Sequence, residues 1–444
     1  MKGIFKGYIF FALLMLAATI VFGLLASWAF LYPESFNGIV PFQQLRPLHV
    51  SAALFWIISG AACCAIIFSN EVFGVYNKSS LGIRAFIWLW VTTIVTVFVY
   101  YFRKEYGGRE YWEFPSWLSI PLLISWVIFM GAYYIPWLGI ANKKPMYLVM
   151  WATGILFFFL TFLEQNLWHI DWFRQSYLRE VTVQWKANGS MVGAWNQMIY
   201  GSSLYLMVKI SGDKTIAENK QVKFFYFLSL TNLMFNWGHH IYNLPTANWV
   251  RHVSYVISMT EWLFFISMIR SFKSKMDEYK IHNYRIPYKF LSISELWLFL
   301  NLTLALMMSI PAINRYTHGT HITVAHAMGT TIGINSMILL GAIGYILGID
   351  TIGQWERKVI QFAFTITQVS FFIFWVSLIA AGLLKGYRSV GLGMNNFQEM
   401  MQPVLQALTV FSFAGIFVVL GLLLIIIVYI KRLWAINTTL SQDQ

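Results

Sequence analysis

The chain has 444 residues, of which 58% are hydrophobic and 11% are charged, and its mean hydropathy is +0.61. This composition excludes an ordinary soluble domain and indicates a protein embedded in a lipid bilayer. The formal net charge of +13 indicates attraction to anionic lipid and excludes nucleic acid as the expected partner, because no basic patch with interleaved aromatic residues stands apart from the apolar stretches.

Twelve apolar stretches are long enough to cross the hydrocarbon core of a bilayer. In chain order they cover residues 8–31, 48–69, 84–101, 117–137, 146–163, 189–210, 222–243, 250–270, 288–310, 322–348, 357–384 and 404–431. They leave little room for a soluble domain, so we expect one integral membrane domain over residues 1–444 with an all-α fold. The first stretch exceeds a signal-peptide core, and we expect it to be retained as a span.

Basic residues are distributed unevenly between the two ends of these stretches. Of the 31 Lys and Arg residues, 20 lie on the side of the N-terminus. The positive-inside rule therefore predicts that the N- and C-termini both lie in the cytoplasm.

Four of the nine histidines lie within or at the ends of apolar stretches, near the predicted outer face: His49, His239, His240 and His326. A single histidine at a span end, such as His49, is more often an interfacial residue than a ligand. The adjacent pair His239 and His240 is different, because burying two imidazoles costs several kcal/mol unless a partner satisfies them. A metal does so directly, and the pair therefore favours metal binding.

His326 and Met328 are two residues apart in the tenth stretch. On a helix this spacing is about 200° of rotation, so the two side chains leave from opposite faces and can serve two different centres. A helix between two haems has this arrangement. Methionine is usually core filler, and we expect that role for most of the 19 methionines.

Four motifs resemble one known family. They are GHHIY at 238–242, YTHGTHITVAH at 316–326, RPLH at 46–49 and GGREYWEFP at 107–115. With them, essentially the whole chain resembles the catalytic subunit of bacterial nitric oxide reductases, in the haem-copper oxidase superfamily. The resemblance implies the subunit I-like fold of that superfamily, with twelve transmembrane helices, in the inner membrane of a bacterium.

The resemblance also implies a set of cofactors. His49 is expected to be an axial ligand of a low-spin haem b, and His326 the proximal ligand of a high-spin haem b3. His239 and His240 are expected to hold a non-haem iron that faces the second haem. Glu110 is expected to help bind a calcium ion at the haem propionates.

Two further glutamates match the family. Glu113, one helical turn after Glu110, is expected to belong to an outer proton uptake route. Glu261 lies deep in the eighth stretch and matches a family glutamate near the active site. A carboxylate at that depth is a functional candidate by default, and a hydrogen-bonded structural glutamate is the alternative.

The sequence departs from the family pattern at four positions. Asn188 stands where the family has a third iron-binding histidine, and Val192 and Asn196 stand where it has glutamates. Asn188 is expected either to bind the iron as a weak neutral ligand or to cap the sixth span. Met328 stands where the family has a second histidine of the low-spin haem, and ligation by histidine and methionine raises the reduction potential.

The expected function is the reduction of two nitric oxide molecules to nitrous oxide with two electrons and two protons. The chain contains no C-x-x-C-H haem attachment motif, so the resemblance implies electrons from a membrane-anchored cytochrome c subunit. The missing glutamates also suit a nitric oxide dismutase, which forms nitrogen and oxygen without external electrons. An oxygen reductase is less favoured, because the stretch around Asn188 lacks the tyrosine that such enzymes carry. A non-catalytic haem sensor is a further alternative.

Overall fold

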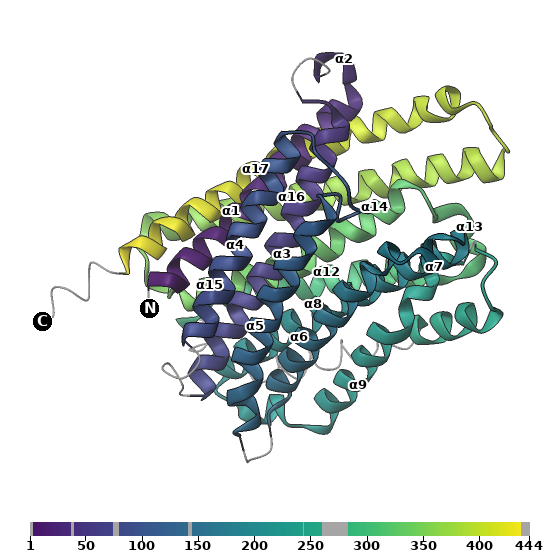
Figure 1. The fold of residues 1–444 in the computed structure, drawn as a ribbon. Coiled ribbons are helices and arrows are strands. Elements are labelled where there is room, and N and C mark those ends of the chain that lie inside the picture. The colour runs from purple at the N-terminus through teal and green to yellow at the C-terminus, as the bar shows by residue number, and fades with distance from the viewer. Residues whose placement is uncertain are drawn as a thin grey trace, which may run out of the picture.

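The computed structural model describes residues 3–36, 40–73, 80–140, 144–242, 244–259 and 283–436, and the regular elements within these ranges are helical. Figure 1 shows the long helices side by side in one bundle. They are α1 (Gly3–Leu31), α3 (Phe42–Phe73), α4 (Ser80–Phe102), α5 (Ser119–Leu138), α6 (Met146–Gln165), α8 (Tyr177–Ser211), α9 (Lys220–Phe235), α12 (Arg285–Ser309), α16 (Gln354–Gly386) and α17 (Phe397–Ala435). The shorter helices that bear on the argument are α2 (Pro33–Phe36), η4 (Asn236–Ile241), α14 (His321–Met328), η5 (Gly329–Ser336) and α15 (Met337–Ile346).

The prediction of twelve spans is confirmed at nine positions. Within the described ranges, nine helical segments are long and apolar enough to cross a membrane, and they match the first five and the last four predicted stretches. The sixth position is the 35-residue helix α8, whose first half is polar. At the seventh position α9 ends at Phe235, where the chain tightens into the 3₁₀ helix η4. The eighth stretch is helical over 248–259 and then leaves the described residues.

The two ends of the bundle are distinguished by the chain termini. The start of α1 and the end of α17 lie together at one end, and α2 lies at the other, which we call the far end (Figure 1). Phe10 and Trp434 are in contact at the first end, with ring centroids 6.1 Å apart. The far end corresponds to the outer face that the positive-inside rule predicts.

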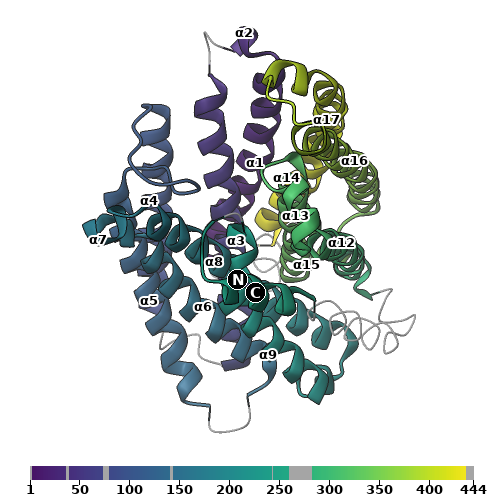
Figure 2. The same ribbon diagram turned by 90° about the vertical axis from the view of Figure 1, so that its right-hand side faces the viewer.

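Helix α3 is central to the arrangement. In Figure 2, α4, α5 and α6 lie on one side of it and α12, α15, α16 and α17 lie on the other. Trp56 Nε1 in α3 donates to Ser336 Oγ at 2.8 Å, and one turn later a Cβ on Gly60 would lie 3.0 Å from Leu339 Cδ1. From the first contact to the second, the residue numbers rise in both helices. Helix α3 and the η5–α15 run are therefore parallel neighbours.

The tenth predicted stretch is not one uniform helix. It runs as α14 up to Met328, continues as the π-helix η5, and becomes α-helical again in α15. Asn301 Nδ2 of α12 donates to Thr330 Oγ1 at 2.8 Å, and Thr330 Oγ1 donates to the His326 carbonyl at 3.1 Å. π-Helical turns are rare and occur frequently at functional sites. Here the wide turn begins directly after the segment that carries His326 and Met328.

Candidate functional site

The adjacent histidines His239 and His240 lie on η4, with ring centroids 4.1 Å apart. The ring of His240 stacks on Trp185 of α8 at 5.3 Å, with an interplanar angle of 16°. Gly189 permits the close approach of η4 to α8, because a Cβ there would lie 2.8 Å from Cβ and 3.2 Å from Cα of Trp237, the residue two before His239. The histidine pair therefore packs against the part of α8 that carries Asn188.

His326 comes close to this pair from another part of the chain. Its ring, like that of His318, lies within electrostatic range of both His239 and His240. Its Nδ1 atom is buried and meets hydrogen-bond geometry with no described residue, although the backbone of Asn301 is near the ring. A ligating histidine commonly faces a carbonyl with Nδ1 and binds through Nε2. With the backbone of Asn301 near the ring, His326 fits the predicted proximal ligand of the high-spin haem.

His49 has the surroundings of an axial haem ligand. Its Nδ1 lies 2.8 Å from the carbonyl oxygen of Thr19 in α1. A carbonyl can only accept, so Nδ1 carries the proton and Nε2 keeps a lone pair. Gly23, one turn after Thr19, makes room for the ring, because a Cβ there would lie 2.7 Å from Nδ1. A carbonyl behind Nδ1 and a lone pair on Nε2 are what a ligating histidine requires.

Met328 lies at the depth of His49. His49 is seven residues before Trp56, and Met328 is eight residues before Ser336. Since Trp56 and Ser336 are in contact on parallel helices, both ligand candidates lie roughly 10–12 Å from that contact in the same direction, at roughly 1.5 Å per residue. Met328 is half-buried and packs against the core. Its depth fits the predicted second ligand of the low-spin haem.

Asn188 lies inside α8, so the prediction that it caps the sixth span is wrong. The helix begins at Tyr177, with Ser176 in the capping position. Trp112 Nε1 donates to Asn188 Oδ1 at 3.4 Å, while Asn188 Nδ2 is buried without a partner among the described residues. An indole N–H can only donate, so the amide oxygen faces Trp112. The amide is left with an unsatisfied donor, which fits a hydrogen bond to a bound ligand better than it fits metal ligation.

In the next two turns of α8 after Asn188, the residues on the same helix face have uncharged side chains. Val192 packs against the core, and Asn196 Oδ1 is buried without a partner in the described part of the chain. Over the same ranges, no group of three or more His, Cys, Asp or Glu side chains is placed to hold a metal ion. Glu261 lies outside the described residues. Imidazole nitrogens such as those of His239 and His240 are donors that iron, copper and zinc accept.

Glu110 and Glu113 meet on Arg46 at the start of α3. The Arg46–Glu110 and Arg46–Glu113 ion pairs measure 3.0 and 2.9 Å. The expected helical turn between the two glutamates is wrong, because the chain forms a loop in which Tyr111 has a φ of 74°. Burial raises the pKa of the Glu113 carboxyl, and Arg46 acts in the opposite direction. Both carboxylates are paired, and calcium binding by Glu110 stays a prediction.

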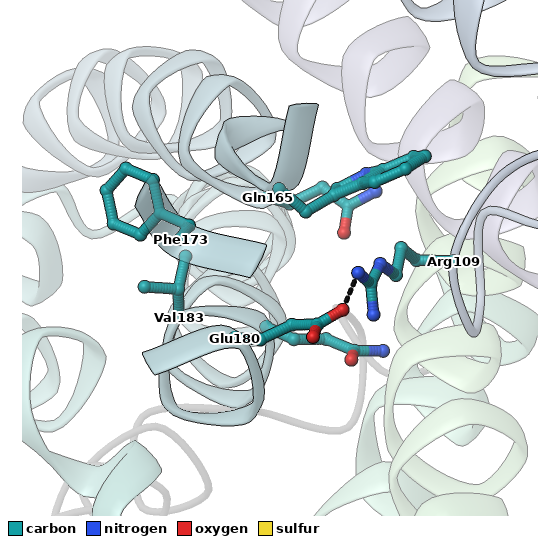
Figure 3. A pocket seen from close by; sticks show the side chains of 7 residues that line it. Arg109, Gln165, Phe173, Glu180 and Val183 are labelled. Carbon is teal, nitrogen blue, oxygen red and sulfur yellow. Dashed lines mark ion pairs between the residues drawn. The ribbon is translucent and has the colours of Figure 1, made fainter. Parts of the chain in front are cut away.

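A small pocket lies at the far end between this loop, α6 and α8 (Figure 3). Arg109 and Glu180 point toward each other and form an ion pair there. Oε1 of Gln165 is buried and has no partner within the described ranges. Glu180, Gln184 and Asn188 follow one another at intervals of four residues along α8, so they share a helix face. Our sequence reasoning missed Glu180 and Gln184, although this spacing could have revealed them.

The chain is similar to proteins of known type. Residues 3–418 match the family described as cytochrome c and quinol oxidase polypeptide I. The chain is 23% identical over 414 residues to cytochrome c oxidase subunit 1 of Rhodobacter capsulatus, which covers 87% of this chain and 76% of that one. It is 21% identical over 370 residues to a nitric oxide reductase subunit of Stutzerimonas stutzeri, covering 78% and 75%. A solved haem-copper terminal oxidase dimer has a similar fold, with a TM-score of 0.71 and 12% identity over 97% of this chain and 84% of that chain.

Proposed function

The chain belongs to the cytochrome c and quinol oxidase polypeptide I family, and from this we propose that it is a nitric oxide reductase-type catalytic subunit. Family membership makes it a haem-binding membrane oxidoreductase. The finer assignment is that it reduces two nitric oxide molecules to nitrous oxide and water, with two electrons and two protons. The electrons would come from a membrane-anchored cytochrome c subunit.

One observation carries the proposal. The adjacent imidazoles of His239 and His240 lie on one turn, within electrostatic reach of His326, whose ring has the backbone of Asn301 beside it. His326 would hold the high-spin haem, and the pair would hold the non-haem metal, which we propose to be iron. When bound, the haem and the metal supply two adjacent redox centres for two small substrate molecules. Helix α8 and η4 pack closely beside the pair, where a Cβ on Gly189 would lie 2.8 Å from Cβ of Trp237.

The remaining residues have proposed roles in this scheme. His49 and Met328 would hold the low-spin haem that relays electrons. Asn188 would donate its amide N–H to the bound substrate. Glu113 is the proposed group of the outer proton uptake route, and Glu261 the proposed acid or base near the active site.

Dismutation of nitric oxide to nitrogen and oxygen is the second candidate function. It is favoured by the neutral face of α8, where Asn188, Val192 and Asn196 supply no carboxylate. A reaction that consumes no external protons does not need proton-carrying groups at these positions. The same neutral face would also raise the electrophilicity of a metal on His239 and His240.

Membrane-inlet mass spectrometry with isotopically labelled nitric oxide separates the two functions. For the purified complex we expect labelled nitrous oxide only when an electron donor is present, with no labelled oxygen. Labelled oxygen formed without a donor would overturn the reductase assignment in favour of the dismutase. Turnover of oxygen but not of nitric oxide would assign the chain to the oxygen reductases. A protein that contains haem but no non-haem metal, and that turns over neither gas, would be a sensor.

A further inference from the structure

The 3₁₀ helix η4 is held by one face of the helix at 248–259. The single hydroxyl proton of Ser254 is shared between the backbone carbonyls of Phe235 and Asn236, which lie 3.0 and 2.9 Å from Oγ. One turn later, Ser258 Oγ donates to Oδ1 of Asn236. Residues four apart share a helix face, so the two serines together fix both the backbone and the side chain at the start of η4.

The side chain of Asn236 in turn contacts the first histidine of the pair. Its Oδ1 lies 3.0 Å from Nδ1 of His239. Since Ser258 donates to this oxygen, the oxygen acts as an acceptor, and it has a second lone pair for the imidazole N–H. The proton of His239 is then on Nδ1. The lone pair is on Nε2, the atom that remains available to a metal.

His240 is oriented in another way. Its ring stacks on Trp185 at 5.3 Å with an interplanar angle of 16°. Stacking sets the plane of a ring but does not select which nitrogen carries the proton. The two neighbouring histidines therefore differ, because the hydrogen-bond chain Ser258–Asn236–His239 selects a tautomer at only one of them.

We propose that Asn236 and Ser258 are positioning residues that hold His239 in the Nδ1–H tautomer and so prepare Nε2 for a metal. The inference rests on the proposed metal site, and it names two residues that the sequence motif does not include. Histidine ligands are often backed by a carboxylate, which raises their basicity. The amide of Asn236 orients the imidazole without adding negative charge, in keeping with the neutral face of α8.

The tautomer can be measured directly. We consider the full-length protein with its haems, depleted of non-haem metal by a chelator and labelled with ¹⁵N-histidine. Comparison with His239→Gln assigns the signals of His239. We expect the Nδ1–H form in the wild type and in Asn236→Asp, and the Nε2–H form in Asn236→Leu. An Nε2–H signal in the wild type would overturn the proposal, because the Asn236 amide would then be donating to the ring.

Metal affinity gives the second readout. Under anaerobic conditions, we expect Asn236→Leu to bind Fe²⁺ about 10–100-fold more weakly than the wild type, the range typical for loss of such a partner. Ser258→Ala should weaken binding less, because the Asn236 bond to His239 remains. Ser125→Ala is the matched control, since the buried Ser125 bonds to the Leu122 carbonyl of its own helix, away from η4.

The outcomes separate this inference from the proposed function. Unchanged Fe²⁺ affinity in Asn236→Leu, or an equal loss in Ser125→Ala, would overturn the positioning role. Absence of Fe²⁺ binding by the wild type, with the tautomers as expected, would instead overturn the proposed metal site. The Ser258–Asn236–His239 hydrogen bonds would then orient His239 without serving a metal.

Discussion

The region around His49 and the region around His239 fix a histidine in the same tautomer by different means. His49 lies on a 32-residue helix, and the backbone carbonyl of Thr19 holds its Nδ1. His239 lies on a six-residue 3₁₀ helix, and the side chain of Asn236 holds its Nδ1. A backbone carbonyl is present whatever the local side chain is, whereas an amide is lost with one substitution.

This difference determines which of the two sites a side-chain substitution can change. At the proposed low-spin haem, the surroundings of His49 come from helix backbone and from the space that Gly23 leaves open. At the proposed metal centre, Asn236, Asn188 and Val192 all contribute through their side chains. The metal centre is therefore the part whose electronics can change while the fold stays the same. The departures from the family pattern fall mainly there, with Met328 the exception.

The largest effect is expected from His49→Leu. Without an axial imidazole, the low-spin haem should be lost almost completely, while non-haem metal binding should be retained because η4 is held by other helices. Reduced-minus-oxidised spectra and metal analysis of the purified complex measure both. Loss of haem and metal together would show that the two regions are one cooperative unit.

His239→Gln tests the other side of the comparison. We expect a loss of Fe²⁺ affinity of at least about tenfold, with both haem spectra retained. His252→Gln is a matched control, because His252 is exposed on the neighbouring helix. An Fe²⁺ affinity that is unchanged in His239→Gln would remove the histidine pair from the metal site.

Met328 is the next test, with an effect on potential rather than on occupancy. If its sulfur ligates the low-spin haem, Met328→Leu should abolish a sulfur-to-iron charge-transfer band near the red edge of the oxidised spectrum. Met328→His should lower the midpoint potential by an amount on the order of 0.1 V, within the range of about 0.8 V that axial ligands span. The control is Met337→Leu, a buried methionine on the same helical run. A bis-imidazole spectrum that is identical in Met328→Leu would make Met328 core filler.

How far the sequence predicts the fold depends on the range of the interactions. Nine of the twelve spans predicted from apolar stretches are matched within the described ranges, because hydrophobic length is a local property. Helix α8 begins twelve residues before the predicted stretch. The polar side chains of its first half find partners at the far end, such as Arg109 for Glu180. The π-helix η5 contacts α12 through the Asn301–Thr330 hydrogen bond, and a local sequence pattern does not reveal such a long-range contact.

The site follows the same rule. Residue type and depth singled out His49, His239, His240 and His326, and in the structure His239 and His240 lie together within electrostatic range of His326. The role of Asn236 was missed, because its partner Ser258 is 22 residues away and only the fold joins them. The loop that carries Glu110 and Glu113 was expected to be helical, but a positive φ is set by the loop as a whole.

The smallest effect is expected from Gly23→Ala. This substitution tests whether the space that Gly23 leaves beside His49 is needed for haem binding or only for helix packing. A Cβ at Gly23 would lie 2.7 Å from both Nδ1 and Cε1 of His49, so Gly23→Ala should shift the ring and destabilise the site by roughly 1–3 kcal/mol. Gly7→Ala in the same helix is the matched control, because its Cβ would meet nothing within 4 Å and should stabilise the protein by about 0.4–1 kcal/mol. We expect Gly23→Ala to lower the occupancy of the low-spin haem several-fold at limiting haem, with Fe²⁺ affinity unchanged. An equal loss of Fe²⁺ affinity would mean that α1 supports the whole bundle, and the contrast between a backbone-fixed and a side-chain-fixed histidine would lose its functional meaning.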